Sequence, residues 1–229
     1  PASLASQPAH RAGNLLLPAL FITGFTSMGM EVAWIRNFTV ILGNQVYSFA
    51  YLLTAYLLAT WLGSAWYRRA VSRGRKPWSP GAMAGWAGLF ALWPVLLTDP
   101  RLHPEPFQVL ASLMPFCFVL GYMTPGLVDR WSGGEPGSAG RAYAVNIIGC
   151  ILGPLAASYL LLPFLSVQVS IALLAIPFPV LFVLLTGKKS WRPLHSVLAG
   201  ATAVSLAFCA FSSLTFENAV GWDNPPIRI

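Results

Sequence analysis

Apolar residues in this sequence come in blocks of roughly twenty, separated by short breaks rich in arginine, proline and glycine. A hydrocarbon core of about 30 Å requires helices of that length, so each block predicts a helix that crosses a bilayer. Seven are expected, over residues 15–36, 45–68, 80–98, 106–128, 141–164, 167–187 and 195–213. The predicted fold class is therefore all-α, a polytopic transmembrane helical bundle of about seven spans.

The helical domain, over residues 14–213, has a short segment on either side. Residues 1–13 are expected to form a flexible N-terminal tail, and residues 214–229 an extracytoplasmic segment that leads into a further soluble domain if one follows. The block starting at Asn14 outlasts the apolar stretch of a signal peptide and lacks an A-x-A cleavage site, so we expect it to remain as the first span. Pro94 is expected to break the third helix near its end.

Composition supports lipid as the solvent for most of the chain. Hydrophobic residues make up 56% and charged residues only 9% of it, whereas soluble domains carry about 25% charged residues. The net charge of +7 does not indicate a nucleic-acid partner, because the basic residues lie at helix ends and form no patch interleaved with aromatic side chains. Three cysteines inside apolar blocks, without CxxC spacing or nearby histidines, are interpreted as packing residues: Cys117, Cys150 and Cys209.

Basic residues are distributed unequally between alternate loops, which predicts the orientation of the chain. With the N-terminus in the cytoplasm, that side carries eleven of the fourteen Lys and Arg residues: Arg11, Arg68, Arg69, Arg73, Arg75, Lys76, Arg130, Arg141, Lys188, Lys189 and Arg192. The opposite side carries Arg36, Arg101 and Arg228. We therefore expect a multi-pass protein of the bacterial cytoplasmic (inner) membrane with a cytoplasmic N-terminus.

Small residues recur at intervals of three or four on three of the predicted helices. Close approach of helix backbones in lipid depends on such residues, so they predict buried interfaces of the bundle, with a substrate path as the alternative. The predicted packing residues are Ala55, Ala59 and Gly63; Gly81, Gly85 and Gly88; and Gly149 and Gly153. Prolines within helices predict kinks or the broken helices of transporters; they include Pro115, Pro125, Pro177 and Pro179.

Three polar residues within the spans require an explanation, because a charge at the bilayer centre costs about 2.5–3.5 kcal/mol. Glu31 is interpreted as a structural clamp to another helix, or else as a carboxylate that binds an ion, a proton or an amine. Arg36, five residues later, can reach the membrane interface and lower the local cost of that carboxylate. Asn146 precedes Gly149 by one turn, where its amide can bond across a tight helix contact.

A charged cytoplasmic corner is predicted where Asp129 and Arg130 close one helix and Arg141 opens the next. The glycine-rich run between them, residues 132–137, follows no strand and lacks the Lys-Ser/Thr ending of a phosphate loop, so it is interpreted as a flexible connection. No metal site is expected, because the three histidines are scattered, and no GxSxG elbow or nucleotide fingerprint occurs. We expect no catalytic residues and no cofactor in this chain.

Three runs carry a family resemblance. The first, Gly24 to Ala50, contains the pattern Glu-Val-x-Trp-x-Arg; the second is YMTPGLVDR, ending at Arg130; and the third, Gly140 to Pro163, contains Tyr-Ala-x-Asn-x-x-Gly-x-x-x-Gly. Together they resemble the membrane-embedded spermidine-synthase-like (polyamine aminopropyltransferase-like) proteins of bacteria, over residues 20–165. The resemblance implies the N-terminal transmembrane region of such a protein. The family's adenosyl-cofactor and polyamine sites belong to a C-terminal domain that these residues do not contain.

Three functions follow as alternatives. The first is a non-catalytic integral membrane module that anchors a soluble domain or packs against other membrane subunits, with lipid as its other partner. The second is a transporter of a small cation or amine that uses Glu31. The third is the membrane part of an aminopropyltransferase-like enzyme with its catalytic domain beyond Ile229. Seven spans would place that domain outside the cytoplasm, where an adenosyl donor is not expected, so the third function requires a different number of spans.

Overall fold

The computed structural model describes residues 7–42, 45–97, 105–186 and 197–207 of the 229-residue chain. Every regular element within these ranges is a helix, and none is a strand. The all-α prediction is therefore confirmed. Several predicted features lie outside the described residues: the segment 214–229, Cys209, and the basic residues Arg101, Lys188, Lys189, Arg192 and Arg228.

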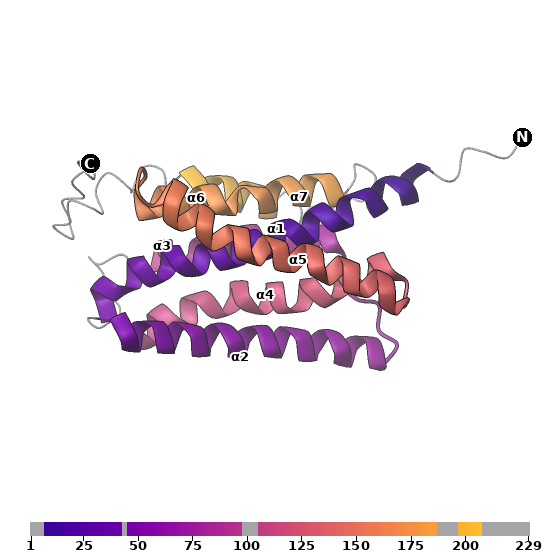
Figure 1. Cartoon of the computed structure of the whole chain (residues 1–229), viewed down its shortest axis with the longest axis horizontal. Coiled ribbons are helices and arrows are strands. Elements are labelled where there is room, and N and C mark those ends of the chain that lie inside the picture. The colour runs from indigo at the N-terminus through magenta and orange to yellow at the C-terminus, as the bar shows by residue number, and fades with distance from the viewer. Residues whose placement is uncertain (1–6, 43–44, 98–104, 187–196, 208–229) are drawn as a thin grey trace, which may run out of the picture.

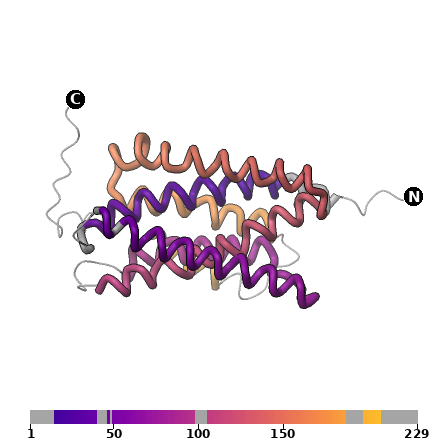
Figure 2. The backbone as a smooth tube through the Cα atoms, turned by 60° about the horizontal axis from the view of Figure 1, so that its bottom comes forward, coloured from indigo at the N-terminus to yellow at the C-terminus, as the bar shows by residue number. Residues whose placement is uncertain are grey.

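The helices run roughly along one long axis, side by side (Figures 1 and 2). They are α1 (Gln7–Leu42), α2 (Gln45–Ser72), α3 (Pro80–Leu97), α4 (Pro106–Ser132), α5 (Pro136–Ala156), α6 (Val167–Ala175) and α7 (Pro177–Thr186). A π-helical turn, η2 (Ala157–Leu161), continues α5, and a short apolar helix covers Val197–Ala207.

Six helical stretches are long and apolar enough to cross a membrane, and they match the first six predicted spans. They are Leu15–Thr39, Phe49–Ser72, Pro80–Leu97, Pro106–Ser132, Pro136–Leu161 and Val167–Thr186. The predicted span 195–213 is described only over Val197–Ala207, which is shorter than a membrane crossing. The chain is therefore a multi-pass membrane module with six candidate spans in its described part.

Helix α1 lies at the centre of the bundle, in contact with α4, α5 and α6, while α2 packs mainly on α4, and α3 packs on α4 and α7. Aromatic side chains connect these layers in the core. The ring of Phe116 on α4 meets Trp34 of α1 edge-on at 5.4 Å and Phe178 of α7 at 5.5 Å. All three side chains are buried, so this contact joins three helices through the middle of the bundle.

Two of the helix contacts are parallel seams in which glycine lets the backbones touch. On α5, Gly149 lies against the backbone of Phe21 and Phe25, and Gly153 against Phe25 and Gly29, so α1 and α5 run in the same direction. On α2, Gly63 lies against Phe118 and Tyr122 of α4 in the same manner. A Cβ atom at any of these glycines would overlap a backbone atom of the neighbouring helix, so the seams require glycine.

The remaining predicted packing residues also lie at helix contacts or in the interior. Gly81, Gly85 and Gly88 of α3 face Thr186, Phe182 and Pro179 of α7, respectively. Ala55 and Ala59 are buried on α2, with 9% and 1% of their surface exposed.

Helix boundaries differ from prediction in α1, α4 and α5. Helix α1 begins at Gln7, inside the predicted flexible tail, with Pro8 in the first turn where a missing N–H costs nothing. Helix α4 continues to Ser132, where Gly133 adopts a left-handed conformation (φ 59°), and α5 begins at Pro136 rather than at residue 141. The predicted flexible connection is therefore a tight turn.

The prolines within the predicted spans have different effects on their helices. The prediction that Pro94 breaks the third helix is wrong, because α3 continues to Leu97 around it; neighbouring helices and local adjustments in membrane bundles tolerate proline within a span. Helix α4 continues through Pro115 and Pro125. The sixth span is interrupted at Ile176, immediately before Pro177, and resumes as α7.

Candidate functional site

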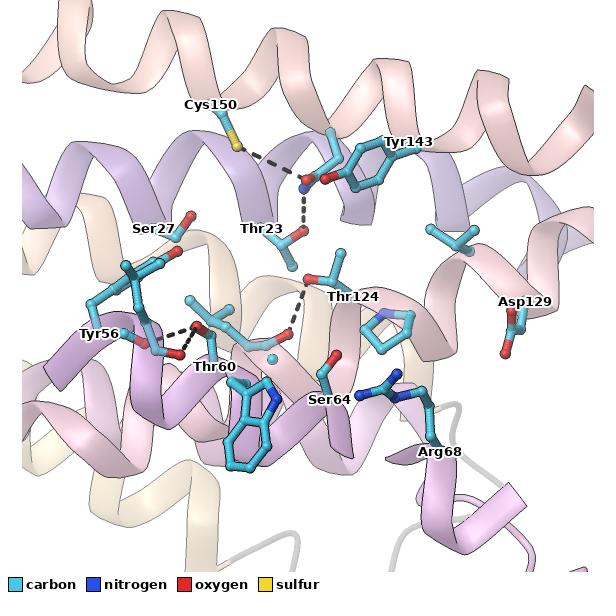
Figure 3. Close-up of a pocket in the computed structure, with 17 residues that line it drawn as sticks. Thr23, Ser27, Tyr56, Thr60, Ser64, Arg68, Thr124, Asp129, Tyr143 and Cys150 are labelled. Carbon is cyan, nitrogen blue, oxygen red and sulfur yellow. Dashed lines mark hydrogen bonds between the residues drawn. The ribbon is translucent and has the colours of Figure 1, made fainter. Parts of the chain in front are cut away.

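A groove of about 730 Å³ lies between α2 and α5, with α1 and α4 beneath it. We call it the α2–α5 groove. Polar side chains line it from four helices, among them Thr23 and Ser27 on α1, Thr60 and Ser64 on α2, Thr124 on α4, and Tyr143 on α5 (Figure 3). Asn146 of α5 also lines the groove. Polar side chains from helices that are distant in sequence thus converge at the depth of the membrane spans.

Three threonine hydroxyl groups of the groove donate to carbonyl oxygens of their own helices. Thr23 donates to Leu20 at 2.8 Å, Thr60 to Tyr56 at 2.8 Å, and Thr124 to Leu120 at 3.0 Å. Each hydroxyl has one donor and two lone pairs, so these bonds use the donors and leave oxygen lone pairs for other contacts. These three side chains therefore offer hydrogen-bond acceptors to the groove.

Asn146 fixes one wall of the groove to the central helix. Its side-chain amide donates to the Leu20 carbonyl at 2.8 Å and to the Thr23 hydroxyl at 3.1 Å. The thiol of Cys150 lies 3.9 Å from the other side of the amide. The sequence predicted that this amide bonds across a tight helix contact, and the contact partner is α1, one turn from the Gly149 seam.

Opposite charges lie at one end of the groove. Arg68 of α2 and Asp129 of α4 both line it there, whereas Ser27, Tyr56 and Cys150 lie toward the other end (Figure 3). One oxygen of the Asp129 carboxylate accepts a hydrogen bond from the Tyr67 hydroxyl at 2.8 Å. The described part of the chain contains no ion pair of Arg68 or Asp129, with each other or with a third residue.

The predicted cytoplasmic corner does not form a single cluster. Arg130 donates to the Trp78 carbonyl at 3.2 Å, and the Trp78 amide donates to the Tyr122 hydroxyl at 3.2 Å. These bonds, with the Trp78 ring stacked on Tyr122 at 4.9 Å, attach the α2–α3 connection to α4. Arg141 is exposed on the first turns of α5. Asp129, Arg130 and Arg141 therefore have three different environments.

Glu135 caps the N-terminus of α5 beside this corner. Its carboxylate accepts hydrogen bonds from the backbone amides of Gly137, at 2.9 Å, and Ser138. The Ser138 side chain and these two amides favour the charged form and hold the pKa of Glu135 below its ordinary value. Sequence reasoning missed this cap, although proline at the first helical position, here Pro136, is typical of a helix start.

Glu31 is half-buried one turn beyond Ser27 on α1. The Tyr56 hydroxyl and the Cys117 thiol are close enough to interact electrostatically with its carboxylate. Neither a hydrogen bond nor an ion pair of Glu31 occurs among the residues that the structure describes. Arg36 donates instead to the Leu162 carbonyl at 3.4 Å. Tyr56 also lines the α2–α5 groove.

The groove itself was not predicted from the sequence. Its α2 residues, Thr60, Ser64 and Arg68, recur every four positions and therefore form one polar stripe on an otherwise apolar helix. This stripe was the available signal, and its partners on α1, α4 and α5 are identifiable only once the helices are placed.

Within the described ranges, no cluster of three or more His, Cys, Asp or Glu residues could hold a metal, and Cys117 and Cys150 are free thiols. Comparisons of this chain with known protein families, curated proteins and solved structures found no match. The functional argument therefore depends on the residues and their geometry.

Proposed function

We propose that this chain is a non-catalytic integral membrane module that packs as a subunit of a larger membrane complex or anchors a soluble domain. One observation supports this function: the two helices that flank the groove are the least buried of the six candidate spans. Only 17% of the α2 span and 22% of the α5 span is buried, compared with 50% or more for α1, α3 and α4. Their outward faces carry large apolar side chains available to lipid or to neighbouring helices.

The rigid interior fits this role. The α1–α5 and α2–α4 seams hold each outer helix against an inner one through backbone contacts, so the outer surface keeps a fixed shape. A fixed apolar surface is what another membrane helix requires in order to pack in one register.

Photo-crosslinking in the native membrane tests the subunit role. We place a photoreactive phenylalanine analogue at Leu58 of α2 or Ile148 of α5, which are 48% and 52% exposed. The matched control carries it at Leu184 of α7, which is 52% exposed but lies on another face. A discrete adduct with a second polypeptide is expected from α2 or α5 and not from α7. Lipid adducts alone at all three positions contradict packing against a subunit.

We also propose that the module corresponds to the membrane region of a spermidine-synthase-like protein of the bacterial inner membrane. This proposal is supported by the three sequence runs alone, of which the third contributes Asn146 and the glycines of the α1–α5 seam. Sequencing the gene past Ile229 tests it. A glycine-rich strand–turn–helix motif there would favour the anchor of an aminopropyltransferase-like enzyme, and an unrelated continuation would exclude it.

A transporter of a small cation or amine is the second candidate, and Glu31 is the observation in its favour. An intramembrane carboxylate without a bonded partner in the described residues is typical of an ion or proton site. Proteoliposomes that contain the parent or the Glu31→Gln variant separate the two functions in a methylammonium or sodium flux assay. Flux in the parent that the substitution abolishes favours transport, whereas no flux, or equal flux in both, excludes it.

A further inference from the structure

The α2–α5 groove combines three properties that point to one class of ligand. It opens between the two least buried spans, so a molecule dissolved in the bilayer can reach it from the side. Part of its lining is apolar, including Leu57, Trp61 and Leu120. A cation, Arg68, and an anion, Asp129, lie at the same end of the groove. An amphiphile with an apolar chain and a zwitterionic headgroup matches all three properties.

The two charges define the headgroup. Arg68 is exposed at the groove end and has no ion pair with a described residue, so its guanidinium is available to a phosphate, for which its planar fork is well suited. The Tyr67 hydroxyl holds the Asp129 carboxylate through one oxygen and leaves the other without a described hydrogen-bond donor. A ligand that carries a phosphate and an ammonium joined by a short carbon linker places one opposite charge at each side chain.

The hydroxyl oxygens of the groove favour a primary amine over a quaternary one. Thr124 lies about one turn before Asp129 on α4, and its donor is already used by the Leu120 carbonyl. A primary ammonium has three N–H donors for the carboxylate and for such acceptors, whereas a trimethylammonium group has none. The volume of about 730 Å³ accommodates a headgroup with part of one chain.

We propose that the α2–α5 groove binds a glycerophospholipid with a primary-amine headgroup. The phosphate pairs with Arg68, the ammonium pairs with Asp129, and an acyl chain lies against Leu57, Trp61 and Leu120. This proposal requires that the chain is embedded in a membrane, and it does not require a partner subunit.

Lipid retention by the intact, purified chain tests the proposal. Protein in a mild detergent is equilibrated with phosphatidylethanolamine, phosphatidylcholine and phosphatidylglycerol of identical acyl chains, and bound lipid is measured by native mass spectrometry. Phosphatidylethanolamine is expected to be retained at least about fivefold better than either of the others, since it alone offers both a phosphate and N–H donors. Equal retention of the three lipids, or a preference for phosphatidylglycerol, overturns the headgroup assignment.

Three variants localise the site. Arg68→Gln is expected to weaken retention of all three lipids, because all carry a phosphate. Asp129→Asn is expected to abolish the preference for phosphatidylethanolamine and to leave phosphatidylglycerol retention unchanged or increased. Arg69→Gln is the matched control, because Arg69 is the next residue of α2 and lines a different surface recess with Trp66 and Arg73. An effect of Arg69→Gln equal to that of Arg68→Gln, or a preference that survives Asp129→Asn, overturns the proposal.

Thermal unfolding in the same detergent identifies a variant that fails to fold. If Arg68→Gln or Asp129→Asn unfolds, the retention ratio of the parent among the three lipids still decides the headgroup, and Arg68→Lys tests the phosphate contact while keeping the charge. A second polypeptide that copurifies with the chain and excludes all three lipids from it also overturns the proposal.

Discussion

Replacing Gly149 by alanine tests whether backbone contact holds α5 to the central helix. A Cβ built at Gly149 lies 2.9 Å from the Phe25 amide nitrogen and still closer to the Phe21 carbonyl oxygen. Both neighbours are main-chain atoms of α1, so no side-chain rotation relieves the overlap. Gly140, nine residues earlier on the same helix, has nothing within 4 Å of such an atom, which makes Gly140→Ala the matched control.

The geometry sets the size of the expected effect. Ordinary contact begins near 3.4 Å, so the 2.9 Å approach to Phe25 alone requires the helices to separate by about 0.5 Å, and the closer oxygen requires more. Overpacking of this kind costs about 1–3 kcal/mol, and the upper half of the range applies because the obstacle is backbone. At Gly140 only the helical preference of alanine acts, which stabilises by about 0.5–1 kcal/mol. The two variants should therefore change the free energy of unfolding in opposite directions.

Reversible unfolding in mixed detergent micelles, followed by the fluorescence of the nine tryptophans, measures both changes against the parent. Gly149→Ala is expected to unfold at a lower mole fraction of denaturing detergent, and Gly140→Ala at the same or a higher one. If Gly149→Ala is as stable as Gly140→Ala, the close seam between α1 and α5 does not exist in the membrane-embedded protein.

Four further changes have defined outcomes. Asn146→Ala removes the amide bonds to α1 and should lower the free energy of unfolding by about 1 kcal/mol in the same assay; no change would mean that water or another group replaces them. Tyr67→Phe leaves the Asp129 carboxylate without its donor and should cost about 1 kcal/mol, with Tyr47→Phe, on an exposed face, as the neutral control. Because the pKa of Glu135 is lowered in the folded state, its contribution to stability is complete above the unfolded value near 4.3 and is lost as the pH falls through the folded value. Glu135→Gln should therefore reduce the decrease in melting temperature at acidic pH. An unchanged decrease would mean that another group causes it. A cysteine at Arg75, in a chain without other cysteines, should react with an impermeant maleimide only after the cytoplasm is opened, and labelling from outside would reverse the predicted orientation.

Hydropathy predicts the spans of this chain well because each one is a local property of about twenty consecutive residues. The starts expected at residues 80, 106 and 167 coincide with the observed starts of α3, α4 and α6. Errors occur where capping or proline chemistry decides the boundary. The Glu135 cap with Pro136 starts α5 before residue 141, and Pro177 divides the sixth span.

The groove is less accessible to sequence reasoning because it depends on which helices become neighbours. The sequence identifies Asn146 and the glycines of α5 as contact residues, but nothing in it specifies α1 as their partner in preference to α4 or α6. Likewise, Thr60 and Thr124 are ordinary residues of two apolar helices until Gly63 and Gly121 bring α2 and α4 together. Pairing of this kind is non-local, and a single sequence carries no direct record of it.

The parallel pairing of α1 with α5 has a consequence for how the protein is made. Leu20 and Asn146, which bond across this seam, are 126 residues apart. A ribosome that adds about 5–20 residues per second needs roughly 6–25 s to synthesise that separation. During this interval the glycine-bearing face of α1 is already synthesised while its main partner does not yet exist. Helix α1 must therefore remain in lipid or beside the insertion machinery, without its main partner, until α5 has been synthesised.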